Sequence, residues 1–289
     1  MKIRREMTIC ELHPAVPLLW FAAAGALAML YWHPIMLLQT LIAAIFLHKR
    51  LKNSKLLRIL FPIMGMTALV NPLFSHEGAT ILAYFPSGNP LTMESIFYGI
   101  AAALMLGAAA ALCFSFGEVI TTDKLLWLIG RILPSLAMLI SMTLRFVPRF
   151  VGHLREAYRA RIALLGPPQK KVDKIRMAAA VTSMTVTWAM ENSVDTADSM
   201  KCRGWGLPGR TSYSNFRMAG RDWQALAVIG ALTLYILAGI GTGALEYQYY
   251  PTFETAQVTP FGISFLLAHA ILVWYPLLME VNYGNPTNK

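Results

Sequence analysis

Charged residues and cysteines are scarce in this sequence, and several motifs for nucleotide and metal binding are missing from it. Only 14% of the 289 residues are charged, whereas a soluble domain has about 25%. The three cysteines, Cys10, Cys113 and Cys202, are far apart and form no C-x-x-C pair, so free thiols are expected instead of a disulfide framework or a metal site. No lysine precedes a serine or threonine, which excludes a P-loop, and H-E-x-x-H is absent. We therefore expect no cofactor and no ATP hydrolysis by this chain.

Hydrophobic residues are abundant instead and make up 56% of the chain. So much apolar surface exceeds what one core can bury, which indicates that lipid surrounds the protein. Six apolar segments are candidates for membrane-spanning helices, namely residues 17–32, 34–48, 57–74, 93–116, 223–245 and 261–281. The first two are short and flank His33-Pro34, which is typical of a tight helical hairpin. The sequence thus predicts an all-α integral membrane protein with about six transmembrane helices.

Positive charges are confined to alternate connections between these segments. Basic residues occur before the first segment and after the second, and fourteen more lie between Arg145 and Arg221. The connections at 33, 75–92 and 246–260 contain no lysine or arginine. Because basic loops stay in the cytoplasm during insertion, the pattern predicts a multi-pass protein of a prokaryotic cell membrane with both termini in the cytoplasm.

A seventh segment, residues 125–144, is long enough to span a membrane but contains Arg131. An arginine near the bilayer centre costs about 2.5–3.5 kcal/mol, and a crossing here would turn a lysine-free connection toward the cytoplasm. We interpret the segment as a buried or interfacial helix on the inner side. The chain then divides into an N-terminal membrane region (1–124), a cytoplasmic or interfacial region (125–222) and a C-terminal membrane region (223–289).

Two long helices are predicted in the central region. The first is expected to kink at Pro148, which removes a backbone donor, and to end at Gly166-Pro167-Pro168, residue types that stop a helix. Its apolar residues at helical spacing are Val151, Leu154 and Tyr158.

The second helix is predicted to begin near Val172 and to end at Gly204 and Gly206, because glycine can adopt the positive φ of a C-cap. One of its faces is first apolar and then acidic, with Met177, Val181, Met184, Trp188, Glu191, Asp195 and Asp198. Such a face is typical of a helix that leaves a core for water. Alternatively, the carboxylates pair with arginines of the first helix, which contributes about 0–1 kcal/mol per exposed pair.

Four stretches occur together in this order: "NPLFSHEGATIL" at 71–82, "PLTMESIFYGI" at 90–100, "LPSLAMLISMTLRFVPRF" at 133–150, and two motifs close to Ala-Arg-Gly. With these stretches the chain resembles the transmembrane T component of energy-coupling factor (ECF) transporters, the EcfT/CbiQ family, over nearly its whole length. The two motifs fall on Ala160-Arg161-Ile162 and Cys202-Arg203-Gly204. Isoleucine thus replaces the glycine of the first motif, and cysteine replaces the alanine of the second.

The resemblance implies a non-catalytic scaffold subunit of an ABC importer with long cytoplasmic coupling helices. In such an assembly two related ABC ATPase subunits bind ATP, and a small membrane S component binds the substrate, typically a vitamin or a transition-metal ion such as cobalt. Ala160, Arg161, Cys202, Arg203 and Gly204 are then the ATPase-coupling residues, with Arg161 and Arg203 as two matching prongs. Substrate choice in this family belongs to the S component, which is a separate chain.

Two other functions fit parts of the sequence. Asn192, Asp195 and Asp198 are similar to the aspartate clusters with which membrane prenyltransferases hold magnesium diphosphate, but those enzymes use two facing clusters and the sequence has one. The basic central region would also suit nucleic acid or anionic lipid. Each basic group close to lipid phosphates contributes about 1 kcal/mol, whereas no nucleic-acid-binding motif is present. We therefore expect contacts with the lipid bilayer alongside partner docking, and no nucleic-acid binding.

Overall fold

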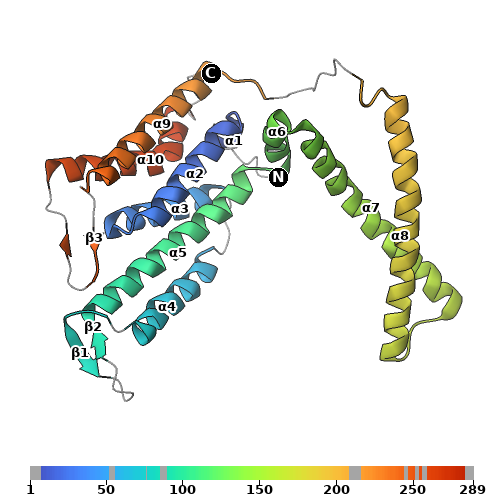
Figure 1. The fold of residues 1–289 in the computed structure, drawn as a ribbon, viewed down its shortest axis with the longest axis horizontal. Helices are drawn as coiled ribbons and strands as arrows, with labels where there is room; N and C mark the ends of the chain where they lie inside the picture. The colour runs from blue at the N-terminus through green and yellow to red at the C-terminus, as the bar shows by residue number, and fades with distance from the viewer. Residues whose placement is uncertain are drawn as a thin grey trace. The chain divides into compact units, whose positions relative to one another are not determined.

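The computed structural model describes residues 8–51, 56–75, 77–84, 90–207, 216–243, 247–250, 254–255 and 259–283. The helices in these ranges are α1 (Thr8–Glu11), α2 (Ala15–Leu30), α3 (Pro34–Leu51), α4 (Leu56–Phe74), α5 (Met93–Val119), α6 (Thr122–Ile132), α7 (Pro134–Leu165), α8 (Lys171–Cys202), α9 (Gly220–Gly241) and α10 (Pro260–Tyr283). Two short antiparallel hairpins, β1 (Ile81–Tyr84) with β2 (Pro90–Thr92) and β3 (Tyr247–Gln248) with β4 (Glu254–Thr255), lie between helices (Figure 1). The predicted all-α membrane fold is confirmed. The basic residues Lys2, Arg4, Arg5, Lys52, Lys55 and Lys289 lie outside the described residues.

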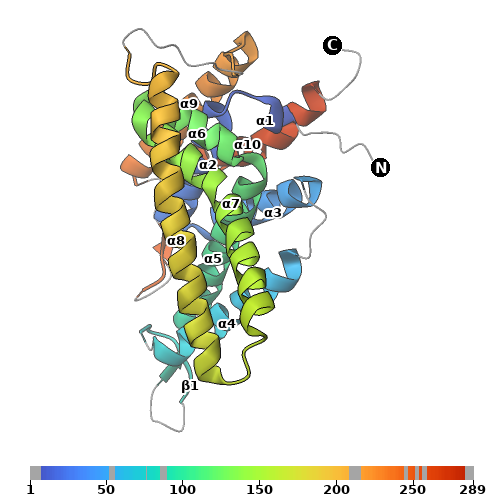
Figure 2. The same cartoon turned by 90° about the vertical axis from the view of Figure 1, so that its right-hand side faces the viewer.

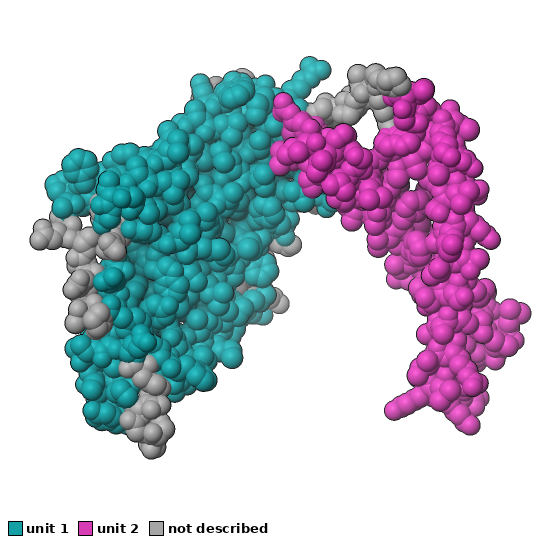
Figure 3. Space-filling model, viewed as in Figure 1, with its two compact units in different colours: residues 1–125, 216–289 teal, residues 126–215 magenta. Residues whose placement is uncertain are grey.

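The chain separates into two compact units (Figure 3). Unit 1 comprises residues 1–125 and 216–289, and unit 2 comprises residues 126–215. Within unit 2, α7 and α8 form two long rods that cross each other (Figure 2). The assignment of residues 125–222 to the cytoplasm stays a prediction.

Five helices of the described chain are long and apolar enough to cross a membrane: α3, α5, α7, α9 and the Pro260–Glu280 part of α10. The remaining predicted segments are α2 and the Arg58–Phe74 part of α4, which are apolar but shorter. Within the described residues, all six segments predicted as spans are therefore mainly helical. As expected from His33-Pro34, only residues 31–33 connect α2 to α3.

The segment predicted as one helix over 125–144 is divided into α6 and α7 at Leu133. Pro134 begins α7, because proline is tolerated in the first turn, and it drives Leu133 out of helical geometry to φ −133° and ψ 80°. α7 then continues through Pro148 to Leu165, so Pro148 does not end the helix. By length and composition α7 also qualifies as a membrane span, which differs from the interfacial helix that the sequence predicts.

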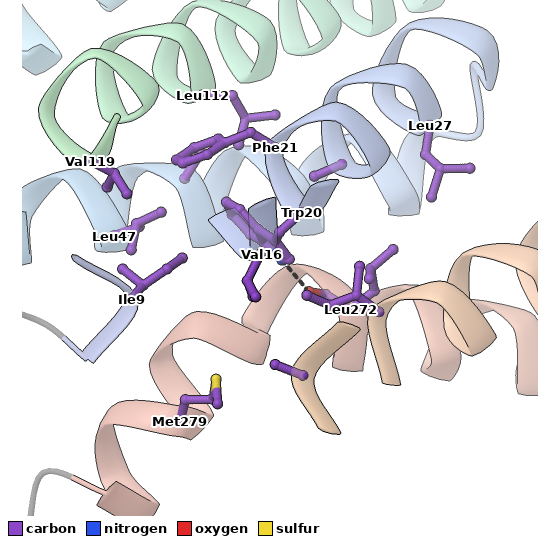
Figure 4. Packing of buried hydrophobic residues seen from close by; sticks show 14 of the residues in the cluster. Ile9, Val16, Trp20, Phe21, Leu27, Leu47, Leu112, Val119, Leu272 and Met279 are labelled. Atoms are coloured by element: carbon purple, nitrogen blue, oxygen red, sulfur yellow. Dashed lines mark hydrogen bonds between the residues drawn. The ribbon is translucent and has the colours of Figure 1, made fainter. Parts of the chain in front are cut away.

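The core of unit 1 lies between α2, α3, α5, α9 and α10 (Figure 4). Trp20 of α2 packs edge-to-face on Phe21, with 4.7 Å between ring centroids, and Phe21 packs in the same way on Phe116 of α5. Leu272 of α10 and Ile229 of α9 are fully buried beside them. Because lipid is as apolar as these side chains, close packing rather than water exclusion holds the helices together.

Small residues at four-residue spacing let α5 approach α4 closely. A Cβ atom on Gly99 would lie 3.0 Å from the carbonyl oxygen of Ala68, and one on Gly107 would lie 2.6 Å from the sulfur of Met64. Ala103 is buried midway between the two glycines. The small-residue stripe of α5 therefore serves packing inside this chain.

Three connections without lysine or arginine meet at one end of unit 1. Tyr249, in the connection after α9, donates its hydroxyl to the carbonyl oxygen of Trp32 at 2.7 Å. The hydroxyls of Tyr250 and Ser75 are 3.2 Å apart, and Trp32 stacks on Tyr98 with 4.9 Å between centroids. Tyrosine and tryptophan concentrate in this way where spans meet water.

Two of the stretches that carry the family resemblance come together at this end, on either side of the β1–β2 hairpin. The buried carboxylate of Glu94 accepts hydrogen bonds from the backbone N–H and the hydroxyl of Thr80, at 3.2 and 2.7 Å. Thr92 donates its hydroxyl to the carbonyl oxygen of Glu77 at 2.7 Å. A Cβ on Gly78 would lie 2.6 Å from Glu94 Oε2, and φ at Gly78 is 140°, so the loop requires glycine here.

The opposite end of unit 1 holds the basic connections. The ammonium of Lys124 donates to the carbonyl oxygens of Cys10 and Val119, at 2.8 and 3.0 Å. The backbone N–H of His13 donates to the carboxylate of Asp222 at the start of α9, at 3.4 Å. α3, α5 and α9 thus each run between a basic end and an end without basic residues.

Candidate docking site on the α7–α8 pair

α7 and α8 form an antiparallel pair with a small contact region where they cross. Residues 166–170 connect the end of α7 to the start of α8. Ala157 of α7 is buried against Met177 and Val181 of α8, and Ile162 packs at the edge of this cluster. Unit 2 therefore has a narrow core, and most of both helices is open on the outer sides.

Aromatic rings extend the crossing toward the N-terminal part of α7. Trp188 of α8 stacks on the imidazole of His153, with 4.2 Å between centroids and 17° between planes. Phe150 approaches the same indole edge-to-face at 6.0 Å. The side of α7 that meets α8 is thus made by Phe150, His153 and Ala157.

The apolar residues that the sequence shows at helical spacing on α7 do not pack against α8. Val151, Leu154 and Tyr158 are exposed and lie on a different face from Ala157. They continue an exposed apolar stripe at steps of three and four residues: Leu136, Ile140, Leu144, Val147, Val151, Leu154 and Tyr158. The reason is that α7 has two apolar faces, and periodicity alone does not tell which of them packs internally.

The sequence predicts part of the α8 face that packs against α7 correctly. Met177 and Val181 are buried as expected, but Met184 is 50% exposed. Thr185 is buried in its place, and its hydroxyl is satisfied by the carbonyl oxygen of Val181 at 2.8 Å. The apolar pattern of the sequence does not identify Thr185 as a packing residue, because threonine is polar. Its hydroxyl can nevertheless be buried when it donates to a carbonyl oxygen of its own helix.

The acidic end of this face is exposed to solvent. Glu191, Asp195 and Asp198 are all exposed, and within the described ranges none of them forms an ion pair with an arginine of α7. Asp198 is 3.5 Å from Lys201 on its own helix. The cross-helix pairing considered for these carboxylates is therefore wrong, and α8 leaves the contact region for water. No group of three histidine, cysteine, aspartate or glutamate side chains in the described residues is placed to hold a metal ion.

The second arginine motif forms the C-terminal cap of α8. Gly204 has φ 77°, and its N–H donates to the carbonyl oxygen of Lys201 at 2.9 Å. The N–H of Trp205 donates to Met200 at 3.0 Å. These two bonds define a Schellman motif, in which glycine occupies the left-handed position. Arg203 is the exposed C-cap residue, where the negative end of the helix dipole favours a cation.

The first motif lies before the end of its helix. Ile162 occupies the glycine position of the motif, and the helix continues for about one more turn to Leu165. Gly166 then closes it with φ 76°, and its N–H donates to the carbonyl oxygen of Ile162 at 2.8 Å. Ala160 is exposed and Arg161 is half-buried. The cap of α7 is thus supplied by Gly166 and not by the third residue of the motif.

The two arginines lie at opposite ends of the crossed pair. Arg161 neighbours Ile162, which packs close to Met177 near the start of α8, whereas Arg203 ends α8. A helical rise of 1.5 Å per residue from Met177 to Arg203 corresponds to a separation of about 40 Å. Arg161 and Arg203 therefore lie in two separate places on the pair.

A groove of about 630 Å³ lies between the N-terminal half of α7 and the last turns of α8. Arg145 and Arg149 of α7 line it together with Asp195 and Arg203 of α8. This groove was missed in the sequence, although the spacing of Arg145 and Arg149 places them on one face of a helix. Only the folded pair shows that Arg203 joins them.

Comparison with known proteins places these features in a family. A family model described as cobalt transport protein, CbiQ, matches residues 8–213. The chain is also similar to a protein of Bacillus subtilis (strain 168) named energy-coupling factor transporter transmembrane protein EcfT. The two are 25% identical over 209 residues, which covers 65% of this chain and 78% of the relative. Both arginine motifs lie inside the part that the family model matches.

Proposed function

The chain belongs to the cobalt transport protein family, CbiQ, and from this premise we propose that it is the transmembrane coupling subunit of an energy-coupling factor importer. The family is one of transporter membrane components, so the chain is a membrane protein of a transport system. In the proposed assembly two cytoplasmic ATPases supply the energy and a small S component binds the substrate, a vitamin or a transition-metal ion. The coupling subunit itself carries out no chemistry.

The separation of Arg161 and Arg203 is the observation that carries this proposal. Two arginines about 40 Å apart on one pair of helices engage two ATPase subunits, one each, rather than one site on a single protein. Guanidinium groups suit this role because they present a rigid fork of donors to carboxylates and carbonyls. Ala160, Cys202 and Gly204 complete the two motifs by shaping the backbone on either side of the arginines.

The orientation follows from the two ends of unit 1. We place the end with Lys124 and the start of α9 in the cytoplasm of a prokaryotic cell, together with both chain termini, because basic connections stay on that side. The end with Trp32 and Tyr249 then faces outward. α7 stays at the inner surface in this arrangement, because Arg145 and Arg149 lie within the twenty residues that would have to cross.

The exposed apolar stripe of α7, from Leu136 to Tyr158, provides the surface for the S component. Most arginines of the same helix occupy other faces, which makes α7 amphipathic. An amphipathic helix at the membrane surface presents its apolar face toward lipid and toward proteins embedded there. Motion of the ATPases moves the crossed pair as a rigid body, and the stripe transmits that motion to the S component.

Replacement of both arginines tests the proposal. Arg161→Ala with Arg203→Ala is expected to abolish capture of the ATPases by the purified complex and ATP-dependent uptake by cells. The matched control is Arg155→Ala with Arg176→Ala, which removes one exposed arginine from each of the same helices. Membrane insertion, measured by membrane fractionation, is expected to be unchanged in both. Normal uptake in the Arg161/Arg203 variant would disprove the coupling role.

A further inference from the structure

A pocket of about 380 Å³ lies at the end of unit 1 where the connections without lysine or arginine meet. The connection between α2 and α3, helix α5 and the segment after α9 all contribute to its wall. Six of its lining residues are aromatic: Tyr31, Trp32, Tyr98, Tyr247, Tyr249 and Tyr250. All six are buried or half-buried, so these rings pack against one another and around the pocket instead of projecting into lipid.

Contacts between the rings hold this aromatic wall in place. Tyr249 is anchored by its hydrogen bond to the carbonyl oxygen of Trp32, and Tyr98 stacks on the Trp32 ring. Tyr249 meets Tyr98 almost at a right angle, with 87° between planes and 5.6 Å between centroids. Tyr247 is inclined by 60° to Tyr249. Rings that line one pocket at such different angles present their faces to it from several sides, and their fixed positions lower the entropy that a ligand loses on binding.

The charges around the pocket favour a cation as its ligand. No lysine or arginine lines the pocket, and none occurs in the connections 75–92 and 246–260. The same connections contain Glu77, Glu246 and Glu254, whose negative charges attract cations to this end of the protein. His33 also lines the pocket, and its imidazole is neutral at pH 7 because burial lowers its pKa below 6.5. An anion would therefore find no positive charge here.

The lining also decides what kind of cation fits. A primary ammonium needs hydrogen-bond acceptors for its three N–H donors, but no carboxylate lines the pocket and the hydroxyls of Tyr249 and Tyr250 already have partners. A quaternary ammonium has no N–H and spreads its charge over methyl groups. Aromatic faces attract such a cation through their π electrons and bury its methyl groups at the same time.

We propose that this pocket binds a quaternary ammonium group such as that of choline. The methyl groups lie against the rings of Trp32, Tyr98 and Tyr247, and a volume of about 380 Å³ is within the usual range for small-molecule sites. The site is independent of the coupling role proposed for Arg161 and Arg203, because all of its residues belong to unit 1. A dissolved choline compound and the head group of a choline lipid carry the same group, and the experiment below separates them.

The test measures binding of radiolabelled choline to the purified full-length chain in mild detergent, by scintillation proximity. Unlabelled choline, ethanolamine and 3,3-dimethylbutan-1-ol compete with it. Ethanolamine has N–H groups in place of the methyl groups, and dimethylbutanol has the shape of choline without its charge.

The pocket variant is Trp32→Leu, which removes a ring but keeps the backbone oxygen to which Tyr249 donates. Trp32→Phe keeps an aromatic face, and Tyr98→Leu removes a second ring of the wall. The control is Trp223→Leu, because Trp223 is exposed in α9 and does not line the pocket. Circular dichroism checks that all variants keep the helical content of the original chain.

We expect the original chain to bind choline in preference to both analogues. Trp32→Leu and Tyr98→Leu should each weaken choline binding about ten-fold, which corresponds to the loss of one desolvated cation–π contact. Trp32→Phe should weaken it less, and Trp223→Leu should bind as the original chain does. Absence of choline binding, or unchanged binding in both leucine variants, would overturn the proposal. Equal competition by dimethylbutanol would show an apolar pocket without a role for charge, and equal competition by ethanolamine would show a site for any ammonium. Either result would also overturn it.

A second measurement identifies the source of the quaternary ammonium group. The original chain is reconstituted in vesicles of phosphatidylglycerol mixed in equal parts with either phosphatidylethanolamine or phosphatidylcholine, and choline binding is measured in both. Binding lost only with phosphatidylcholine would support the site and identify the lipid head group as its occupant. Equal binding in both vesicles would support it with a dissolved choline compound as the occupant. Absence of binding in both would contradict a site that operates in a membrane.

Discussion

The indole N–H of Trp20 on α2 donates to the carbonyl oxygen of Leu272 on α10, at 2.7 Å. Leu272 lies four residues before Pro276, which has no N–H to give to this oxygen. Both partners are fully buried in the core of unit 1 (Figure 4), where an unpaired carbonyl is unfavourable. A side chain of one helix therefore replaces the hydrogen bond that proline removes from another, and fixes α2 against α10.

Trp20→Phe is expected to lower the free energy of unfolding by about 1–3 kcal/mol, because the Leu272 oxygen loses its donor. Pro276→Ala restores a helical N–H at the position that the oxygen needs. In the Pro276→Ala background the cost of Trp20→Phe should therefore be clearly smaller. Denaturant unfolding in detergent, followed by circular dichroism, measures the four free energies. Identical costs in the two backgrounds would contradict the replacement of one donor by the other.

Gly204→Ala is expected to weaken the end of α8. An alanine would have to adopt the left-handed φ of 77° at this position, and its Cβ would lie 3.2 Å from Leu207 Cδ1. The left-handed backbone conformation costs an alanine about 1–2 kcal/mol. Gly152→Ala is the matched control, because a Cβ at that helical position meets nothing within 4 Å and should stabilise α7 by about 0.5–1 kcal/mol. Thermal unfolding gives the stabilities, and co-purification gives ATPase capture. Capture as strong in the Gly204 variant as in the control would mean that the Schellman cap does not position Arg203.

The ends of the long helices could be predicted from the sequence, but their packing faces could be predicted only in part. Gly166 and Gly204 mark helix ends because a left-handed residue is a local requirement. The choice between the Val151 face and the Ala157 face of α7 depends on α8 and on the environment of the outer surface. Both faces have helical periodicity. In water the apolar face of a helix packs inward, but at a membrane surface an apolar face can also contact lipid, so the pattern does not show which face packs against α8.

The candidate site, too, could be predicted only in part from the sequence. The sequence motifs propose Arg161 and Arg203 as site residues, yet their opposite positions on the crossed pair follow only from the antiparallel course of α7 and α8. The groove requires Arg145 and Arg203 to approach from residues far apart in the chain. Such a long-range juxtaposition leaves no local signal beyond the spacing of Arg145 and Arg149.

His33 is expected to make stability depend on pH. It lies between α2 and α3, outside the spans, and burial lowers the pKa of its imidazole below 6.5. The unfolded chain therefore takes up a proton at a higher pH than the folded chain. The contribution of neutral His33 is present above about pH 6.5 and is lost as the pH falls from there toward the folded pKa.

His33→Asn removes this titration. The melting temperature of the original chain should fall more steeply than that of the variant between about pH 7 and pH 5. Differential scanning fluorimetry at several pH values measures both slopes, and His33→Gln provides a second side chain that does not titrate. Parallel slopes in all three proteins would show that His33 binds protons equally in the folded and unfolded states.

Ile162→Gly would restore the glycine of the first motif, and we expect it to weaken coupling instead of improving it. The Ile162 side chain packs at the cluster of Ala157, Met177 and Val181, and its carbonyl oxygen accepts the capping bond from Gly166. A glycine loses this packing and adds backbone freedom inside the last turns, which together cost about 2 kcal/mol. The turn that holds Arg161 should then fray, so hydrogen exchange over residues 161–165 should become faster and ATPase capture weaker. Ile162→Val keeps most of the contact and should behave as the original chain. Capture by Ile162→Gly at or above the original level would show that Arg161 does not need the extension of α7 to Gly166.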